Sequence, residues 1–177
     1  MQSVSLCFNK VKNDCVKFIT SQETSTDKFK NKDKMIKSFL IPICFWITKK
    51  ANKKKPYFVG LAGGQGTGKT TISSIIKIIL EKYFKKKVFK ISIDDFYKTR
   101  KERTNLSKKV HPMLITRGVP GTHDIKMMLD FFKKAKNKRF KKLKVPNFNK
   151  AIDDRFPKKN WNNINEQPDI IISVSYT

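Results

Sequence analysis

One short segment of the chain combines glycines with a lysine and a threonine at a spacing that suits phosphate. Residues 63–70 read Gly-Gly-Gln-Gly-Thr-Gly-Lys-Thr, which fits the pattern G-x-x-x-x-G-K-[ST]. Glycines let several backbone N–H groups converge on one anion, and a helix that starts at the end of the loop adds its positive dipole end. Lys69 would contact the β- and γ-phosphates of a nucleoside triphosphate, and the Thr70 hydroxyl would bind Mg²⁺. The set predicted to bind the nucleotide is Gly63, Gly64, Gln65, Gly66, Thr67, Gly68, Lys69, Thr70 and Thr71.

The elements that this motif requires lie on both sides of it. Residues 57–62, Tyr-Phe-Val-Gly-Leu-Ala, have the apolar run of a buried strand. After the loop, apolar residues recur at helical spacing from Ile72 to Leu80, as in a helix packed on a sheet. A glycine-rich turn that matches the motif by chance is the alternative. The order of strand, loop and helix favours the nucleotide-binding loop.

A pair of carboxylates follows the second predicted strand. Residues 88–93, Val-Phe-Lys-Ile-Ser-Ile, form this strand, and Asp94 and Asp95 come directly after it. Ligands of parallel α/β sheets bind at the carboxyl ends of the strands. Asp94 would therefore accept a proton from an attacking hydroxyl or hold a Mg²⁺-bound water, while Asp95 should point elsewhere. The alternative is that the pair only caps a turn.

Two further segments hold residue types that suit a small, anionic and hydroxylated substrate. The segment that begins at Arg117 reads Arg-Gly-Val-Pro-Gly-Thr-His-Asp. Arg117 would bind a carboxylate or phosphate, and His123 or Asp124 would bind the hydroxyls. An exposed turn with unrelated polar residues is the alternative. In a later polar cluster, we assign Lys150 to substrate binding and expect Arg155 to neutralise phosphate charge during transfer.

Three predicted strands place the chain in the α/β class. The third is the buried run at residues 168–174, Pro-Asp-Ile-Ile-Ile-Ser-Val. We predict a parallel sheet of the P-loop NTPase type, flanked by helices and incomplete, with about three strands. Residues 35–177 would form this domain, with the apolar segment 39–47 as a helix at the edge of the core. Residues 1–34 would be a polar N-terminal extension, either an appendage or a peripheral helix.

The composition limits the classes of partner. The chain has 40 basic and 14 acidic residues and a net charge of +26, but only five of the basic residues are arginine. Because arginine is the better residue for phosphates and base edges, we interpret the charge as a solvated surface with weak, non-specific polyanion binding. The three cysteines lack metal-ligand spacing and indicate a reducing compartment. With no recognisable signal peptide or transmembrane segment, we expect a cytoplasmic protein without a membrane partner.

Taken in order, these segments resemble the D-glycerate 3-kinase family of plants and fungi and its ATP-binding, kinase-like relatives. That family belongs with the uridine kinase and phosphoribulokinase group of P-loop kinases. The resemblance runs from about Phe39 to Ile172, and its Arg-Gly-x-Pro-Gly-Thr-His-Asp element is specific to the family among P-loop kinases. The other matching residues are 60–71, Ser-Ile-Asp-Asp-Phe-Tyr at 92–97, Arg103, and His-Pro-Met-Leu at 111–114.

The resemblance implies an ATP-dependent kinase that transfers the γ-phosphoryl group to a hydroxyl of a small organic acid. Residues 63–71 would hold ATP and Mg²⁺, and Asp94 would be the base or the ligand of a metal-bound water. The residues that match segments facing the acceptor are Arg117, His123, Asp124 and Arg155. The alternative is a catalytically inactive, basic ATP-binding protein that interacts with nucleic acid or an acidic partner. A nucleoside or pantothenate kinase relative is a third, minor option.

The sequence departs from the family pattern in two places. Asn149 stands where the family has Asp in a Tyr-Asp-Lys-Ser segment, and the glycines that usually precede Asp154 are absent. After the strand at 168–174 the family continues with a Glu-Gly-Trp segment, a lid and further strands. We therefore expect a C-terminally truncated domain, in which the free edge of the strand at 57–62 is bare or covered by residues 39–47. Such a chain would bind ATP weakly and have little or no turnover.

Overall fold

The chain divides into two units, and its last strand returns to the first of them. The computed structural model describes residues 2–51, 56–64, 66–137, 140 and 142–175. The first unit comprises Met1–Lys90 and Pro168–Ser175, and the second comprises Ile91–Gln167. The expected boundary at residue 34 does not coincide with this division, because the first 34 residues are part of the first unit.

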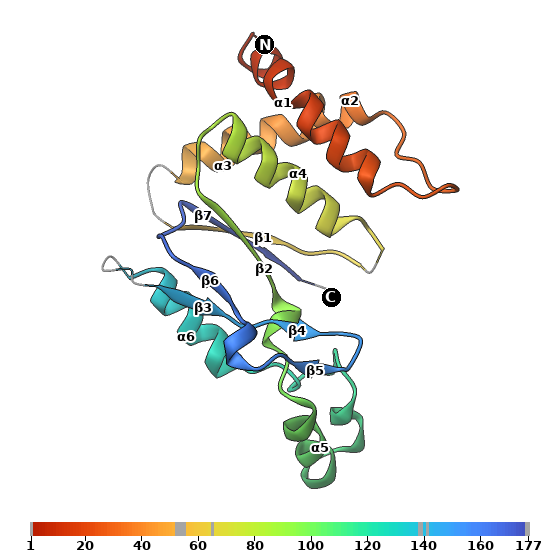
Figure 1. The fold of residues 1–177 in the computed structure, drawn as a ribbon, viewed down its shortest axis with the longest axis vertical. Coiled ribbons are helices and arrows are strands. Elements are labelled where there is room, and N and C mark those ends of the chain that lie inside the picture. The colour runs from red at the N-terminus through yellow and green to blue at the C-terminus, as the bar shows by residue number, and fades with distance from the viewer. Residues whose placement is uncertain (1, 52–55, 65, 138–139, 141, 176–177) are drawn as a thin grey trace. The chain divides into compact units, whose positions relative to one another are not determined.

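A three-stranded sheet contains the three predicted strands. They are β1 (Tyr57–Leu61), β2 (Val88–Ser92) and β7 (Ile170–Val174), in the order β1-β7-β2 (Figure 1). β1 and β7 are parallel, with register from Tyr57↔Ile170 to Leu61↔Val174. The three isoleucines at the start of β7 are fully buried, as expected for a central strand. The predicted α/β class is confirmed, and the third strand lies beside the first as expected.

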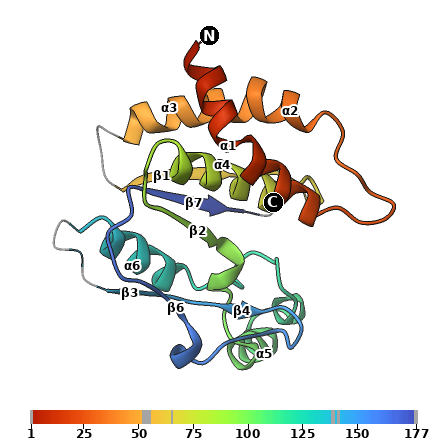
Figure 2. The same ribbon diagram turned by 45° about the horizontal axis from the view of Figure 1, so that its top comes forward.

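Helices from both sides of β1 in the sequence cover one face of this sheet. The long helix after the glycine-rich loop is α4 (Lys69–Lys82), and its buried isoleucines belong to the same core cluster as Ile170 and Ile172. α1 (Gln2–Ser21) and α3 (Ile41–Ala51) contact α4 on this side (Figures 1 and 2). The predicted amphipathic helix after the loop therefore packs on the sheet.

The N-terminal segment is more closely integrated than a polar extension would be. Helix α1 (Gln2–Ser21) buries Cys7, Val11, Cys15 and Ile19, all with no exposed surface. These residues recur at every fourth position, which places them on one helix face. Lysines and asparagines between them lower the mean hydropathy of the segment, so that a reading by composition missed the stripe.

A second helical run follows, and it changes its geometry before a proline. α2 (Lys32–Met35), the π-helical turn η1 (Ile36–Leu40) and α3 (Ile41–Ala51) are continuous. Pro42 lacks a backbone N–H, and its ring would collide with the carbonyl of residue 38 in a regular α-helix; the wider turn relieves this conflict. The predicted helix over residues 39–47 is confirmed, with Ile41, Cys44 and Ile47 buried. No helix in the described ranges is long and apolar enough to cross a membrane.

The second unit combines short helices with two antiparallel ribbons. Strand β3 (Leu143–Val145) pairs with β6 (Asn162–Ile164), and β4 (Phe148–Asn149) pairs with β5 (Asp154–Arg155). The 3-10 turn η2 (Ile93–Phe96) follows β2 directly. The remaining helical elements are α5 (Arg100–Lys109), η3 (Pro112–Ile115), α6 (Ile125–Ala135) and η4 (Lys158–Asn160).

Candidate functional site

The glycine-rich loop of the first unit connects β1 to α4 with a backbone that glycine makes accessible. Gly68 precedes the helix with φ 76°, in the left-handed region that other residues enter only with strain. At Gly63 the constraint is a close approach, because a Cβ atom would lie 3.3 Å from the hydroxyl oxygen of Thr67. Glycine at these two positions lets the backbone turn tightly before the N-terminus of α4. An anion can approach backbone N–H groups in such a loop.

Lys69 lies against this loop. Its side chain is buried, and its amine donates hydrogen bonds to the Gly64 carbonyl and to the Thr67 hydroxyl. The Thr67 hydroxyl in turn donates to the Gly64 carbonyl at 2.9 Å. The amine is therefore held within the turn to which the predicted phosphate ligands belong. Thr70 and Thr71 follow in the first turn of α4, and Gln65 lies outside the described residues.

A lysine of β2 supports the first turns of the same helix. The amine of Lys90 donates to the Ser74 hydroxyl at 2.5 Å and to the Thr70 carbonyl at 3.3 Å. Burial lowers the pKa of this amine, and the charge of Lys77 lowers it further. Reading the lysines as a solvated surface missed Lys90, although its place within a predicted strand was a signal.

In the second unit, Asp94 is the centre of a polar cluster. Its side chain is only 9% exposed, and its carboxylate forms an ion pair with the amine of Lys150 at 2.7 Å. Tyr97 lies next to it, and burial, the charge of Asp94 and a hydrogen bond with Asp94 all raise the pKa of the phenol. The structure thus brings together Asp94 and Lys150, which the sequence had assigned separately.

Asp95 has a different role from its neighbour. Its two carboxylate oxygens accept the backbone N–H groups of Ser92 and Phe148, each at 3.3 Å. Burial raises the pKa of Asp95, and these hydrogen bonds oppose the shift. The carboxylate therefore stabilises the turn after β2 and connects it to β4. Turn capping, the alternative considered for the pair, describes Asp95.

His123 stacks on the ring of Tyr97. The two ring centroids are 4.1 Å apart with an interplanar angle of 23°. Burial lowers the pKa of His123; the charge of Asp94 opposes this shift and that of Lys98 adds to it. The Nε2 atom is buried, and among the described residues it has no hydrogen-bond partner. The imidazole is therefore neutral at pH 7, and its Nε2 atom can still form a hydrogen bond.

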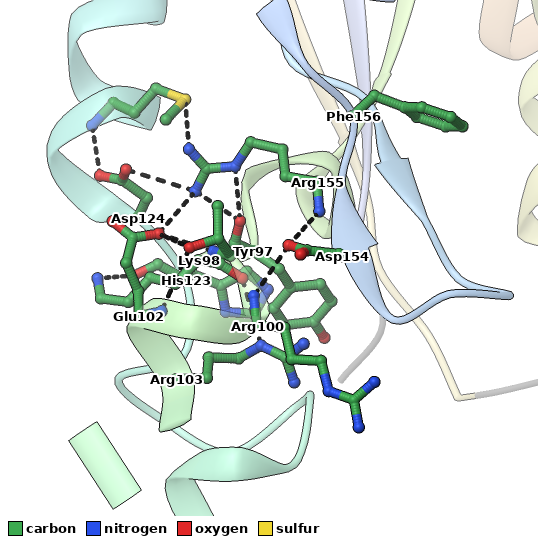
Figure 3. A network of polar contacts seen from close by, with 12 residues as sticks. Tyr97, Lys98, Arg100, Glu102, Arg103, His123, Asp124, Asp154, Arg155 and Phe156 are labelled. Atoms are coloured by element: carbon green, nitrogen blue, oxygen red, sulfur yellow. Dashed lines mark hydrogen bonds and ion pairs between the residues drawn. The ribbon is translucent and has the colours of Figure 1, made fainter. Parts of the chain in front are cut away.

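Arg155 binds the backbone of Tyr97 and pairs with Asp124. The Arg155 guanidinium donates two hydrogen bonds to the Tyr97 carbonyl, at 3.0 and 2.6 Å, and is 9% exposed. It points toward Asp124, at 3.6 Å (Figure 3). Asp124 also caps α6 by accepting the Met127 N–H at 3.0 Å. These contacts position Tyr97; the role of Arg155 in phosphoryl transfer stays a prediction.

Two more arginines share the carboxylate of Asp153. Arg103 is fully buried and pairs with Asp153 at 2.9 Å. Arg117 pairs with it at 3.1 Å and also donates to the Lys150 carbonyl at 3.0 Å. Because Arg117 is about one-third exposed, its guanidinium keeps access to solvent while it fixes the backbone of Lys150. Sequence reasoning missed Tyr97 and Asp153 as members of this cluster.

The chain is similar to known kinases over part of their length, although no protein-family model matches it. It is 31% identical over 120 residues to "Uncharacterized kinase mug58" of Schizosaccharomyces pombe, covering 63% of this chain and 42% of that protein. It is 30% identical over 141 residues to chloroplastic D-glycerate 3-kinase of Arabidopsis thaliana, covering 70% of this chain and 31% of that protein. The solved structure of a D-glycerate 3-kinase from Cryptococcus neoformans has a TM-score of 0.68 and 21% identity, covering 78% of this chain and 52% of that one. The homologues and structural neighbours are P-loop kinases. The chain spans less than half the length of the Schizosaccharomyces pombe and Arabidopsis thaliana proteins.

Proposed function

We propose that this chain, whose homologues are P-loop kinases, contributes an ATP site and an acceptor site to a small-molecule kinase of the D-glycerate 3-kinase type. The γ-phosphoryl group of ATP would pass to a hydroxyl of a small organic acid. The observation that supports this best is the buried Asp94 carboxylate, which is paired with Lys150 and adjoined by Tyr97. A base, a cation and hydrogen-bonding groups are what the transfer of phosphoryl to an alcohol requires.

The loop of the first unit fits the phosphates of ATP. A Cβ atom at position 63 would crowd the Thr67 side chain, so the loop is tightly curved there. A tightly curved, glycine-rich loop leaves backbone N–H groups accessible to an anion. In this proposal the Lys69 amine neutralises charge on the β- and γ-phosphates. Thr70, in the first turn of α4, is the proposed Mg²⁺ ligand. No cluster of three or more His, Cys, Asp or Glu that could hold a metal occurs in the described ranges, which suits Mg²⁺, since it is held by few side chains plus phosphates and water.

Asp94 is the proposed base in the second unit. The acceptor oxygen forms a bond to the γ-phosphorus, the bond from that phosphorus to the β,γ-bridging oxygen breaks, and ADP leaves. The proton of the acceptor hydroxyl passes to the Asp94 carboxylate. Lys150, which is about half-exposed beyond its ion pair with Asp94, would attract an anionic acceptor. Arg117 would bind the acceptor carboxylate with the exposed part of its guanidinium.

His123 completes the acceptor site in this proposal. Its buried Nε2 has no partner among the described residues, and an unpaired buried nitrogen is costly unless a ligand or water satisfies it. Because its pKa is lowered, the imidazole is neutral at pH 7 and can exchange a hydrogen bond with a substrate hydroxyl.

Phosphoryl transfer from radiolabelled ATP to D-glycerate and to a panel of small hydroxy acids tests the function. We expect slow formation of labelled product with at least one of them. Asp94→Asn should lose nearly all of this residual turnover with ATP affinity retained, because the carboxylate acts in the transition state. Asp14→Asn, an exposed carboxylate on α1, is the matched control. Equal rates in both variants would remove Asp94 from the mechanism, and no product with any acid would refute the acceptor class.

The net charge of +26 supports one alternative: a basic ATP-binding protein without catalysis that interacts with nucleic acid or an acidic partner. It predicts ATP binding without transfer to any hydroxy acid, and retention of a polyanion at physiological salt. The kinase proposal instead predicts that polyanion binding is weak and disappears as salt is raised.

A further inference from the structure

A cavity lies in the second unit and is formed by residues other than those of the glycine-rich loop. It has a volume of about 570 Å³ and is lined by α6, β3 and the segment around η4. Ligand cavities in proteins commonly span roughly 300–1,000 Å³, so this one has room for a ligand of nucleotide size. Of the residues assigned above to the acceptor, only Asp124 also lines it.

The inner surface of this cavity is apolar and partly aromatic. Phe131 and Leu143 line it and are 3% and 7% exposed. Trp161 lines it as well, and its indole N–H donates to the Phe156 carbonyl at 2.8 Å. This hydrogen bond fixes the ring and satisfies its one donor, so the indole offers the cavity an apolar, aromatic surface. Such rings stack readily with planar ligands.

Five lysines line the same cavity: Lys126 and Lys134 of α6, Lys142, Lys144 of β3, and Lys158 of η4. Lys144 donates to the Lys158 carbonyl at 3.2 Å. Among the residues that the structure describes, none of the five amines has an ion pair with a carboxylate.

The carboxylates that line the cavity do not balance these lysines. There are two, Asp124 and Asp130. Asp124 already caps α6 and pairs with Arg155, so Asp130 is left to oppose five cations. The lysines therefore give the cavity a positive potential, while Phe131, Leu143 and Trp161 give it an apolar surface. This combination favours an anion with an aromatic part.

We propose that this cavity binds a nucleotide unit, with its base against Trp161 and its phosphate among the lysines. Lysine acts as a mobile point charge and not as a rigid fork, so the cavity would recognise phosphate charge more than its orientation. The unit could be a free nucleotide or part of a single strand, since both present a base and a phosphate. The cavity shares no residue with the proposed ATP site. It would therefore still bind a nucleotide unit in a chain whose glycine-rich loop cannot bind ATP.

Tryptophan fluorescence tests this site directly. The chain has two tryptophans, and Trp46 is 54% exposed on α3, so Trp46→Phe leaves Trp161 as the single reporter. In the full chain with this change and Lys69→Ala, we expect AMP to quench Trp161 with a saturable curve and adenosine to have little effect. A short single-stranded oligoadenylate is the second arm: binding by the strand but not by AMP identifies a strand as the source of the unit.

A matched pair of triple variants separates the cavity from general charge. Lys126→Gln, Lys134→Gln and Lys158→Gln should weaken binding at least about tenfold, since charged phosphate contacts are lost. The control removes three exposed lysines of α5, by Lys101→Gln, Lys108→Gln and Lys109→Gln, and should change binding less than about twofold, as expected of distant exposed charges.

Arginine at the three cavity positions provides a check on folding, because it keeps the charge and should keep binding. Equal weakening by the two glutamine variants, loss of binding in the arginine variant, or no quenching by either AMP or the strand would overturn the assignment.

Discussion

Removal of the Arg103 side chain should strongly destabilise the second unit. Its guanidinium has no exposed surface and donates to three backbone carbonyls, those of Lys98 at 3.2 Å, Ile115 at 2.6 Å and Asp153 at 2.6 Å. It also lies 5.8 Å from the centroid of the Phe148 ring. Arg103→Met keeps most of the apolar volume and removes every one of these donors.

The expected loss is about 3–4 kcal/mol in the free energy of unfolding. The three hydrogen bonds are partly buried, and a carbonyl left without its donor there costs ~1 kcal/mol, which gives ~3 kcal/mol for three. The ion pair with Asp153 adds less than ~1 kcal/mol, because that carboxylate is 38% exposed and also pairs with Arg117. Contact of the methionine with Phe148 returns part of the loss.

Urea unfolding followed by Trp161 fluorescence in a Trp46→Phe background measures this change in the second unit. Arg100→Met is the matched control, since Arg100 lies on the same helix and is exposed; it should change stability by less than ~0.5 kcal/mol. A loss below ~1 kcal/mol for Arg103→Met, or an equal loss in the two variants, would refute the argument that these three carbonyls depend on the guanidinium.

Three further results are expected. Lys69→Ala should remove most of the binding of a fluorescent ATP analogue, since backbone N–H groups alone leave the phosphate charge poorly neutralised; equal affinity in the two proteins would contradict the loop assignment. In a proton NMR titration, His123 should titrate below its ordinary pKa near 6.5. Because the unfolded state then binds more protons, the contribution of His123 to stability is present above about pH 6.5 and is lost as the pH falls. His123→Gln should flatten that pH dependence of stability. Burial raises the pKa of Cys7 to about 11 and of Cys15 to about 12, so at pH 8 the native thiols should react slowly with a disulfide reagent and quickly after denaturation; fast reaction of the native chain would show that these residues are exposed.

The sequence predicted those parts of the fold that depend on local pattern. The glycine spacing around Lys69, the apolar runs of the three strands and the stripe of α4 each follow from one segment of chain. Asp124, assigned from the sequence to the substrate, also caps α6 by accepting the Met127 N–H. A helix was one of the two alternatives for residues 1–34, but the buried face of α1 was missed because polar residues between its members make the segment polar.

The candidate site was less predictable because its contacts join distant segments. The Asp94–Lys150 ion pair spans 56 positions of the chain, and no local pattern encodes such a distance. Tyr97 had no role assigned from the sequence, yet it stacks on His123 and its carbonyl binds Arg155. Pattern identified several of the participants, but their pairing depends on how β4 and β5 fold back on the turn after β2.

The scarcity of arginine acquires a physical meaning in the second unit. Arg103, Arg117 and Arg155 each bind at least one backbone carbonyl and a carboxylate at the same time. A guanidinium has three nitrogens and can donate to acceptors on two sides at once. A lysine amine has one nitrogen and cannot reach acceptors fixed on both sides. Substitution of lysine at Arg103 should therefore lose nearly as much stability as methionine does, in spite of the conserved charge. The lysines of this chain supply charge, and these three arginines supply geometry.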